Sequence, residues 1–207
     1  MLALCSVPVF KSPSMNKLEV AFSLFDGYNM RCPQHISWQG KDYPLEYFYA
    51  LKLYEWVKKL SPAAAESLLL ASRCQHIGRW EIARNTYPEG RVGYLKWRSD
   101  LAKYHAKIAE GFLREAGYDQ EMIDSVREIV LKQKIKHNPA VQTMENALCL
   151  VFLEFQYDEL ISRHTDEKLI GILRKTWAKM SSEGQEAALG LAYSNRGKEL
   201  IKMALAG

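Results

Sequence analysis

The chain has 207 residues, of which 48% are hydrophobic and 25% are charged, so it is long enough to bury a core and has the composition of a globular protein. Its formal net charge of +4 is compatible with an anionic ligand but is too small to argue for nucleic-acid binding by itself. No apolar run approaches the roughly 20 residues that a membrane-spanning helix needs, so we expect no membrane partner.

The start of the chain and its cysteines favour a cytoplasmic protein. The first seven residues lack a basic segment followed by a long apolar one, so no secretory signal is expected. Residues 1–25 are expected to form a loosely ordered arm and a first helix. The cysteines form no CxxC pair, which favours reduced thiols over disulfides or a zinc ribbon; they are Cys5, Cys32, Cys74 and Cys149.

Helical signals follow one another along the first half of the chain. Asp42-Tyr43-Pro44 is expected to open a helix that reaches Leu60, because proline suits a first turn whose N–H groups have no partner. Ser61-Pro62 is expected to start the next helix, which runs toward His76. Residues 83–93 are rich in turn formers and predict a loop.

The second half continues the helical pattern. A third helix is predicted to stop near Gly117, and apolar spacing over 123–130 predicts a fourth. Asn138-Pro139 starts a fifth helix, which is apolar on nearly all sides over 147–155 and is therefore expected to be central. A sixth follows Thr165, and two short helices are separated near Ser194-Asn195. Since no alternating segment of strand length, linker or repeat appears, we predict one all-α domain over 1–207 with about eight helices.

Imidazole, guanidinium and indole groups concentrate between positions 75 and 105, which predicts a site. His76 ends an apolar helix, and His105 shares a helix face with Leu101 and Phe112, so both are expected to point inward. Two inward histidines on neighbouring helices are able to meet. They are interpreted either as satisfied core residues or as metal ligands and acid–base groups.

A carboxylate on the predicted central helix raises the same question. Glu145 is costly to bury unless it is paired, and its partner is expected to be Lys132, an arginine or a metal ion. Glu46 is explained by a favourable interaction with the dipole of the first predicted helix. The candidate catalytic residues are therefore His76, His105 and Glu145. The candidate ligands of a divalent metal ion are His76, His105, Glu145 and Asn146.

Arginines interleaved with aromatic residues predict an anion site, because guanidinium groups match phosphate and carboxylate geometry. For Arg91 and Lys96 a solvated basic face is an equally good explanation, and the helix dipole accounts for most of the cations at 132–137, Lys136 among them. The candidate contacts to a small anionic substrate are Arg79, Trp80, Arg84, Trp97, Arg98, Lys132 and Gln142.

Two short segments resemble the ATP-binding signatures of class I aminoacyl-tRNA synthetases. They are His76-Ile77-Gly78-Arg79 and Lys179-Met180-Ser181-Ser182. In that family the first signature follows a strand of a nucleotide-binding sheet, whereas here it ends a predicted helix with no parallel-sheet pattern around it. We therefore reject a synthetase function.

The segment 69–78 is similar to a helix of the HD-superfamily phosphohydrolases. Gln75-His76 stands where that superfamily has His-Asp. The resemblance places its first ligand near Glu46 and its last near Glu145, Asn146 or Glu154. It implies an HD-like helical core in which the metal site is changed, mononuclear or absent.

Nearly the whole chain resembles an uncharacterised all-helical family that is described as a domain of unknown function, some of whose members carry a glutamyl-tRNA synthetase label. The family pattern has Asp where this chain has Asn146, which would weaken a catalytic role at that position. The resemblance implies a shared site but supplies no reaction. Its matching segments include 26–29, 44–46, 75–84, 87–91, 93–98, His105, 142–146, 149–154 and 174–177.

Three hypotheses follow from these residues. The first is a cytoplasmic hydrolase that acts on a small anionic, phosphorylated or nucleotide-like substrate, with a divalent metal ion or with acid–base groups alone. The second is a non-catalytic sensor that binds a small anion with the same residues. The third is an RNA-binding protein, against which the small net charge argues. Oligomeric state is not predicted.

Overall fold

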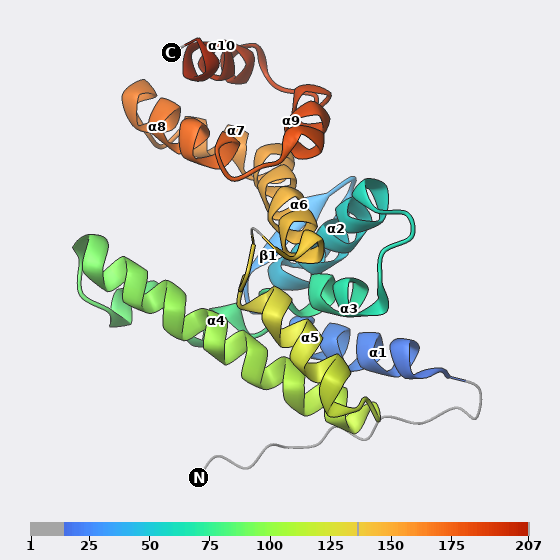
Figure 1. Ribbon diagram of the computed structural model, residues 1–207. Helices are drawn as coiled ribbons and strands as arrows, with labels where there is room; N and C mark the ends of the chain where they lie inside the picture. The colour runs from blue at the N-terminus through green and yellow to red at the C-terminus, as the bar shows by residue number, and fades with distance from the viewer. Residues whose placement is uncertain (1–14, 136, 207) are drawn as a thin grey trace.

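The computed structural model describes residues 15–135 and 137–206, and within them the chain is all-α, as predicted (Figure 1). These residues form ten α-helices rather than about eight, and α1 corresponds to the first helix expected within 1–25, whereas the short α7 was not expected. Cys5, Lys136 and the part of the predicted arm that falls in 1–14 lie outside the described residues. The helices are α1 Lys17–Asn29, α2 Leu45–Leu60, α3 Glu66–Cys74, α4 Gly90–Glu115, α5 Gln120–Val130, α6 Pro139–Phe155, α7 Tyr157–Ile161, α8 Asp166–Trp177, α9 Ser182–Leu189 and α10 Asn195–Leu205.

Helix α6 is central, which confirms the prediction made from its apolar sequence. Its start is fixed by Pro139 in the first turn and by the side chain of Asn138, which accepts the N–H of Ala140. It packs against α2, α3, α5, α7 and α9. In Figure 1 it lies between the layer of α1, α4 and α5 and the layer of α7–α10. Both layers therefore bury apolar side chains against one helix.

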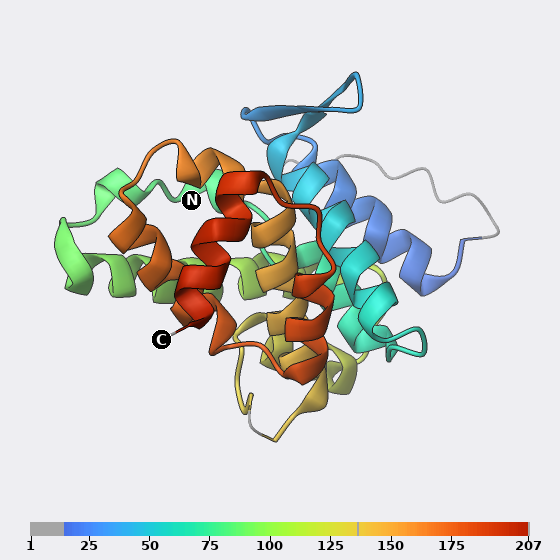
Figure 2. The ribbon, with the colours of Figure 1, turned by 90° about the horizontal axis from the view of Figure 1, so that it is seen from above.

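A small hairpin corrects the prediction that no strand occurs. Strand β1, His35–Trp38, pairs antiparallel with β2, Lys41–Pro44. Gln39 and Gly40 turn the chain with positive φ angles of 50° and 76°, the combination that two-residue hairpin loops require. Figure 2 shows the hairpin projecting from the helices. Asp42 to Pro44 thus belong to β2, and α2 begins directly after them.

Three other predicted boundaries were wrong. Ser61 ends α2 by donating its N–H to Val57, and the next helix, α3, begins only at Glu66. The predicted loop over 83–93 contains a 3-10 turn, Arg84–Thr86, but α4 already begins at Gly90. The cations at 132–137 were expected to end the fourth helix, but α5 ends at Val130, so Lys132 and Lys134 lie in the turns that follow it. The residue types at these boundaries favour turns, but where each helix begins and ends also depends on how it packs against its neighbours.

The described cysteines are free and buried, namely Cys32, Cys74 and Cys149. In the described part of the chain, no helix has both the length and the hydropathy needed to span a membrane.

Candidate functional site

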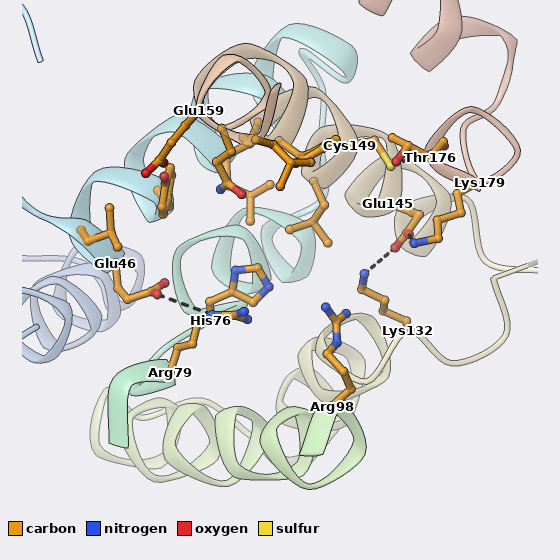
Figure 3. A pocket seen from close by; sticks show the side chains of 18 of the residues that line it. Glu46, His76, Arg79, Arg98, Lys132, Glu145, Cys149, Glu159, Thr176 and Lys179 are labelled. Atoms are coloured by element: carbon orange, nitrogen blue, oxygen red, sulfur yellow. Dashed lines mark hydrogen bonds and ion pairs between the residues drawn. The ribbon is translucent and has the colours of Figure 1, made fainter. Parts of the chain in front are cut away.

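A cavity of about 470 Å³ opens where α2, α6, α7 and α8 meet the segment after α3 and the first part of α4. Its apolar wall comes from α2, α6 and α7, which contribute Leu45, Leu53, Leu148, Val151, Phe152 and Leu160. Its polar side chains come from segments that lie far apart in the sequence, as Figure 3 shows. The size and the mixed lining are those of a small-molecule site.

Glu46 and Arg79 face each other across one end of this cavity (Figure 3). Arg79 Nε lies 3.8 Å from Glu46 Oε1, while Glu46 Oε2 is buried without a hydrogen-bond partner among the described residues. Burial raises the pKa of Glu46 to about 7, and nearby Arg79 opposes this shift. The Arg79 guanidinium carbon lies 5.2 Å from the centre of the Trp97 ring, which holds it in place.

Glu145 is paired with lysines at the other end of the cavity. Lys132 Nζ lies 2.5 Å from Glu145 Oε2, and Lys179 Nζ lies 3.8 Å from Oε1. The ion pair with Lys132 is the structural alternative that the sequence analysis left open. Lys132 has a φ of 54°, in the left-handed region that costs a residue with a side chain about 1 to 3 kcal/mol.

The imidazole of His76 lines the cavity between these two ends. No side-chain hydrogen bond joins it to another residue in the described part of the chain. Burial lowers its pKa well below the ordinary value, and the nearby charges of Arg79, Lys132 and Arg98 act in the same direction. His76 therefore presents a neutral ring at neutral pH.

His105 lies behind His76 and does not line the cavity. The two ring centres are 5.8 Å apart, so the predicted meeting of the histidines is confirmed. His105 Nδ1 is 2.5 Å from the carbonyl oxygen of Ile77 and donates to it, while its buried Nε2 lacks a partner among the described residues. Burial lowers the pKa of His105 to about 4, aided by Arg79 and Arg98 and opposed by the hydrogen bond to Ile77.

Three of the predicted substrate contacts, Arg79, Arg98 and Lys132, line the cavity, whereas the other four make contacts within the protein. Trp80 packs on Tyr28 at 5.7 Å between ring centres, and Trp97 donates its Nε1–H to the carbonyl oxygen of Ile82. Arg84 donates to the carbonyl oxygens of Tyr87 and Pro88, and so ties the loop before α4. Gln142 donates to Asn146 and to the carbonyl oxygen of Lys179. Internal contacts thus account for four of the predicted residues.

The chain belongs to the family described as a domain of unknown function (DUF4202). The family model matches residues 19–201, which confirms the predicted membership in an uncharacterised family. Comparison with curated proteins and with solved structures gave no match. The HD-like core therefore stays a prediction.

Of the predicted metal ligands, His76 and His105 lie together, whereas Glu145 and Asn146 are engaged with other residues. Within residues 15–135 and 137–206, no three His, Cys, Asp or Glu side chains are placed to hold one metal ion. Glu145 is engaged by two lysines, and Asn146 accepts from Gln142 while donating to Ser181. Glu145 and Asn146 thus already have partners within the protein and are not free to join the two histidines as metal ligands.

Several residues of the cavity were missed by the sequence analysis. Glu46 was explained by the helix dipole, because nothing in the local sequence shows that the folded chain buries it. Lys179 belongs to the second synthetase-like segment, and Arg79 to the first, so both segments contribute a cation to the cavity. The remaining missed polar residues are Tyr49, Cys149, Gln156, Glu159, Arg163 and Thr176.

Proposed function

We propose that the protein is a hydrolase that binds a small phosphorylated molecule in this cavity and releases its phosphate. The observation that carries the proposal is an excess of positive charge around a neutral imidazole. Three carboxylates line the cavity, and Glu46 among them is partly neutral near pH 7. Five cationic side chains line it as well, namely Arg79, Arg98, Lys132, Arg163 and Lys179. The predicted cytoplasmic location remains part of this proposal.

Arg98, Lys132 and Lys179 are the groups that we expect to hold the phosphate. Arg98 has no ion-pair partner among the described residues, so its fork is available for a bidentate contact. Lys132 and Lys179 share the single carboxylate of Glu145 and therefore retain one positive charge in excess. A dianionic phosphate adds the negative charge that this end of the cavity lacks.

Glu46 is the group that we expect to supply a proton to the leaving oxygen. A carboxyl group whose pKa lies near 7 is able to donate a proton at neutral pH, which an ordinary carboxylate does poorly. Its Oε2 is buried without a partner among the described residues, so no protein group competes for a proton on that atom. Arg79 is expected to hold the other oxygen of the carboxyl group in place.

The experiment is a release assay for inorganic phosphate on a panel of small phosphate monoesters, with thermal shift as the binding readout. We expect Arg98→Gln to raise KM about 10-fold or more, because a hydrogen bond to a charged group contributes about 1.5 to 3 kcal/mol. Arg91→Gln is the matched control, since Arg91 is an exposed arginine of the same helix that does not line the cavity. Its kinetics should equal those of the wild type.

The possible results separate the hypotheses. Binding of phosphate monoesters without release would establish the sensor in place of the hydrolase. No binding and no release with any member of the panel would contradict the proposal.

A further inference from the structure

The imidazole of His76 is the group in the cavity best suited to attack a phosphorus atom. It is neutral, it lines the cavity between the two charged ends, and Arg79, Arg98 and Lys132 surround it. We infer that His76 is the nucleophile of the proposed hydrolysis and carries the phosphoryl group as phosphohistidine. The inference rests on the proposed function and adds a covalent step to it.

The surrounding cations favour this role over that of a general base. A base gains a proton and becomes positive, which the charges of Arg79, Arg98 and Lys132 oppose. A nucleophile gains a phosphoryl group with up to two negative charges, which the same side chains stabilise. The positive charges around His76 therefore favour a nucleophile over a general base.

The other side chains of the cavity are poorer nucleophiles. Burial, followed by the charge of Glu145, raises the pKa of Cys149 to about 12, so its thiol stays protonated. Burial and the charge of Glu46 raise the pKa of Tyr49 to about 12 as well. The hydroxyl of Thr176 donates to the carbonyl oxygen of Ile172. Each of these groups needs a base to activate it, whereas His76 already offers a lone pair.

His105 is placed to act as a positioning residue for His76. Because its Nδ1–H donates to Ile77, its neutral tautomer leaves Nε2 as a lone pair that is buried and unsatisfied. An N–H from the neighbouring ring of His76 would satisfy that acceptor after a small approach of the two rings. The opposite nitrogen of His76 would then be fixed as the one that faces the cavity.

The reaction consists of two balanced steps. In the first, the lone pair of His76 forms an N–P bond, the P–O bond to the leaving oxygen breaks, and Glu46 gives that oxygen its proton. The imidazole keeps its N–H, so its positive charge is offset by the phosphoryl group. In the second, water attacks phosphorus and gives a proton to the Glu46 carboxylate. The N–P electron pair returns to His76, and inorganic phosphate leaves.

The test uses the full chain and acetyl phosphate as the phosphoryl donor, followed by quenching in base and measurement of intact mass. We expect the mass of one phosphoryl group, stable in base, lost in acid and mapped to His76. Glu46→Gln should still be labelled, because acetate leaves without a proton, and should lose its label at least about 10-fold more slowly, in keeping with general acid–base catalysis.

Matched variants make the assignment specific. His76→Asn should carry no label, and His76→Gln serves as a second variant if circular dichroism shows that the first does not fold. His35→Asn is the control, since His35 is an exposed histidine in the hairpin, and it should be labelled like the wild type. Label on another residue, or phosphate release that persists in both folded His76 variants, would overturn the inference while leaving the hydrolase intact.

Failure of the proposed function has a different signature. In that case neither phosphate monoesters nor acetyl phosphate would be hydrolysed, inorganic phosphate would not shift the melting temperature, and both proposals would fall.

The positioning role of His105 is tested by phosphorus NMR of the phosphorylated His105→Phe variant. We expect a mixture of the two ring isomers of phosphohistidine in place of one. A merely structural role would reduce the amount of label and leave a single isomer.

Discussion

At the scale of single residues, the site consists of ionisable groups that burial keeps neutral next to cations that stay charged. Glu46 retains its proton up to about pH 7, while His105 loses its proton at about pH 4. Both shifts have burial as their largest cause. The two neutral forms place a protonated carboxyl group and an uncharged imidazole near Arg79.

The carboxyl group of Glu46 should make stability depend on pH. It ionises near pH 4.5 in the unfolded chain but near 7 in the folded one, so the free energy of unfolding falls as pH rises through that interval. The full effect is about 3 kcal/mol, at about 1.4 kcal/mol per pKa unit. Glu46→Gln should therefore match the wild type near pH 4 and exceed its stability by up to that amount at pH 8.

Urea unfolding at both pH values measures this difference. His105 has the opposite dependence, since its lowered pKa makes stability rise from about pH 4 to 6.5, but it is present in both proteins and cancels. An advantage of Glu46→Gln that is equal at pH 4 and pH 8 would contradict a protonated Glu46.

At the scale of elements, the start of α4 differs from the rest of the helix in how closely the chain packs against it. The start carries Arg98 to the cavity and Trp97 against Arg79, and the close approach of the preceding loop sets where this part lies. A Cβ atom on Gly93 would lie 1.9 Å from the backbone oxygen of Pro88, so only glycine permits that approach. A Cβ atom on Gly111, further along the same helix, would meet nothing within 4 Å.

These two glycines make a matched pair of substitutions. Gly93→Ala should destabilise the protein by about 1 to 3 kcal/mol, the range for overpacking, and should weaken phosphate binding by displacing Arg98. Gly111→Ala should stabilise it by about 1 kcal/mol, because alanine has the higher helix propensity. Thermal unfolding and phosphate binding of both variants provide the test. If both variants had the same stability and phosphate affinity, the loop at Pro88 would be able to move away from α4, which would contradict the prediction.

At the scale of the whole molecule, the cavity joins the two layers that α6 separates. Arg98 belongs to the layer of α4, whereas Thr176 and Lys179 come from α8 and the turn after it (Figures 1 and 3). No element supplies the site alone. A ligand that contacts both layers is lost when either layer unfolds locally. Its binding free energy therefore adds to the free energy of local unfolding of each layer.

Hydrogen exchange should reveal this connection. We expect inorganic phosphate to slow amide exchange at the start of α4 and at the end of α8 together, and to leave α10 unchanged, since no residue of α10 lines the cavity. Mass spectrometry of peptides from the three helices measures it. Protection confined to one layer would mean that the anion does not bridge them.

The sequence by itself determined the helical class and the central position of α6, because both depend on apolar periodicity and on caps such as Asn138-Pro139 that act within one turn. It also singled out His76, Arg79, Arg98 and Lys132. Tertiary structure alone decided that Glu46 is buried beside Arg79, that Lys132 and Lys179 share Glu145, and that Trp80 and Arg84 serve internal contacts. A side chain's pKa and its available partners depend on burial and charge supplied by distant segments, which no local pattern records.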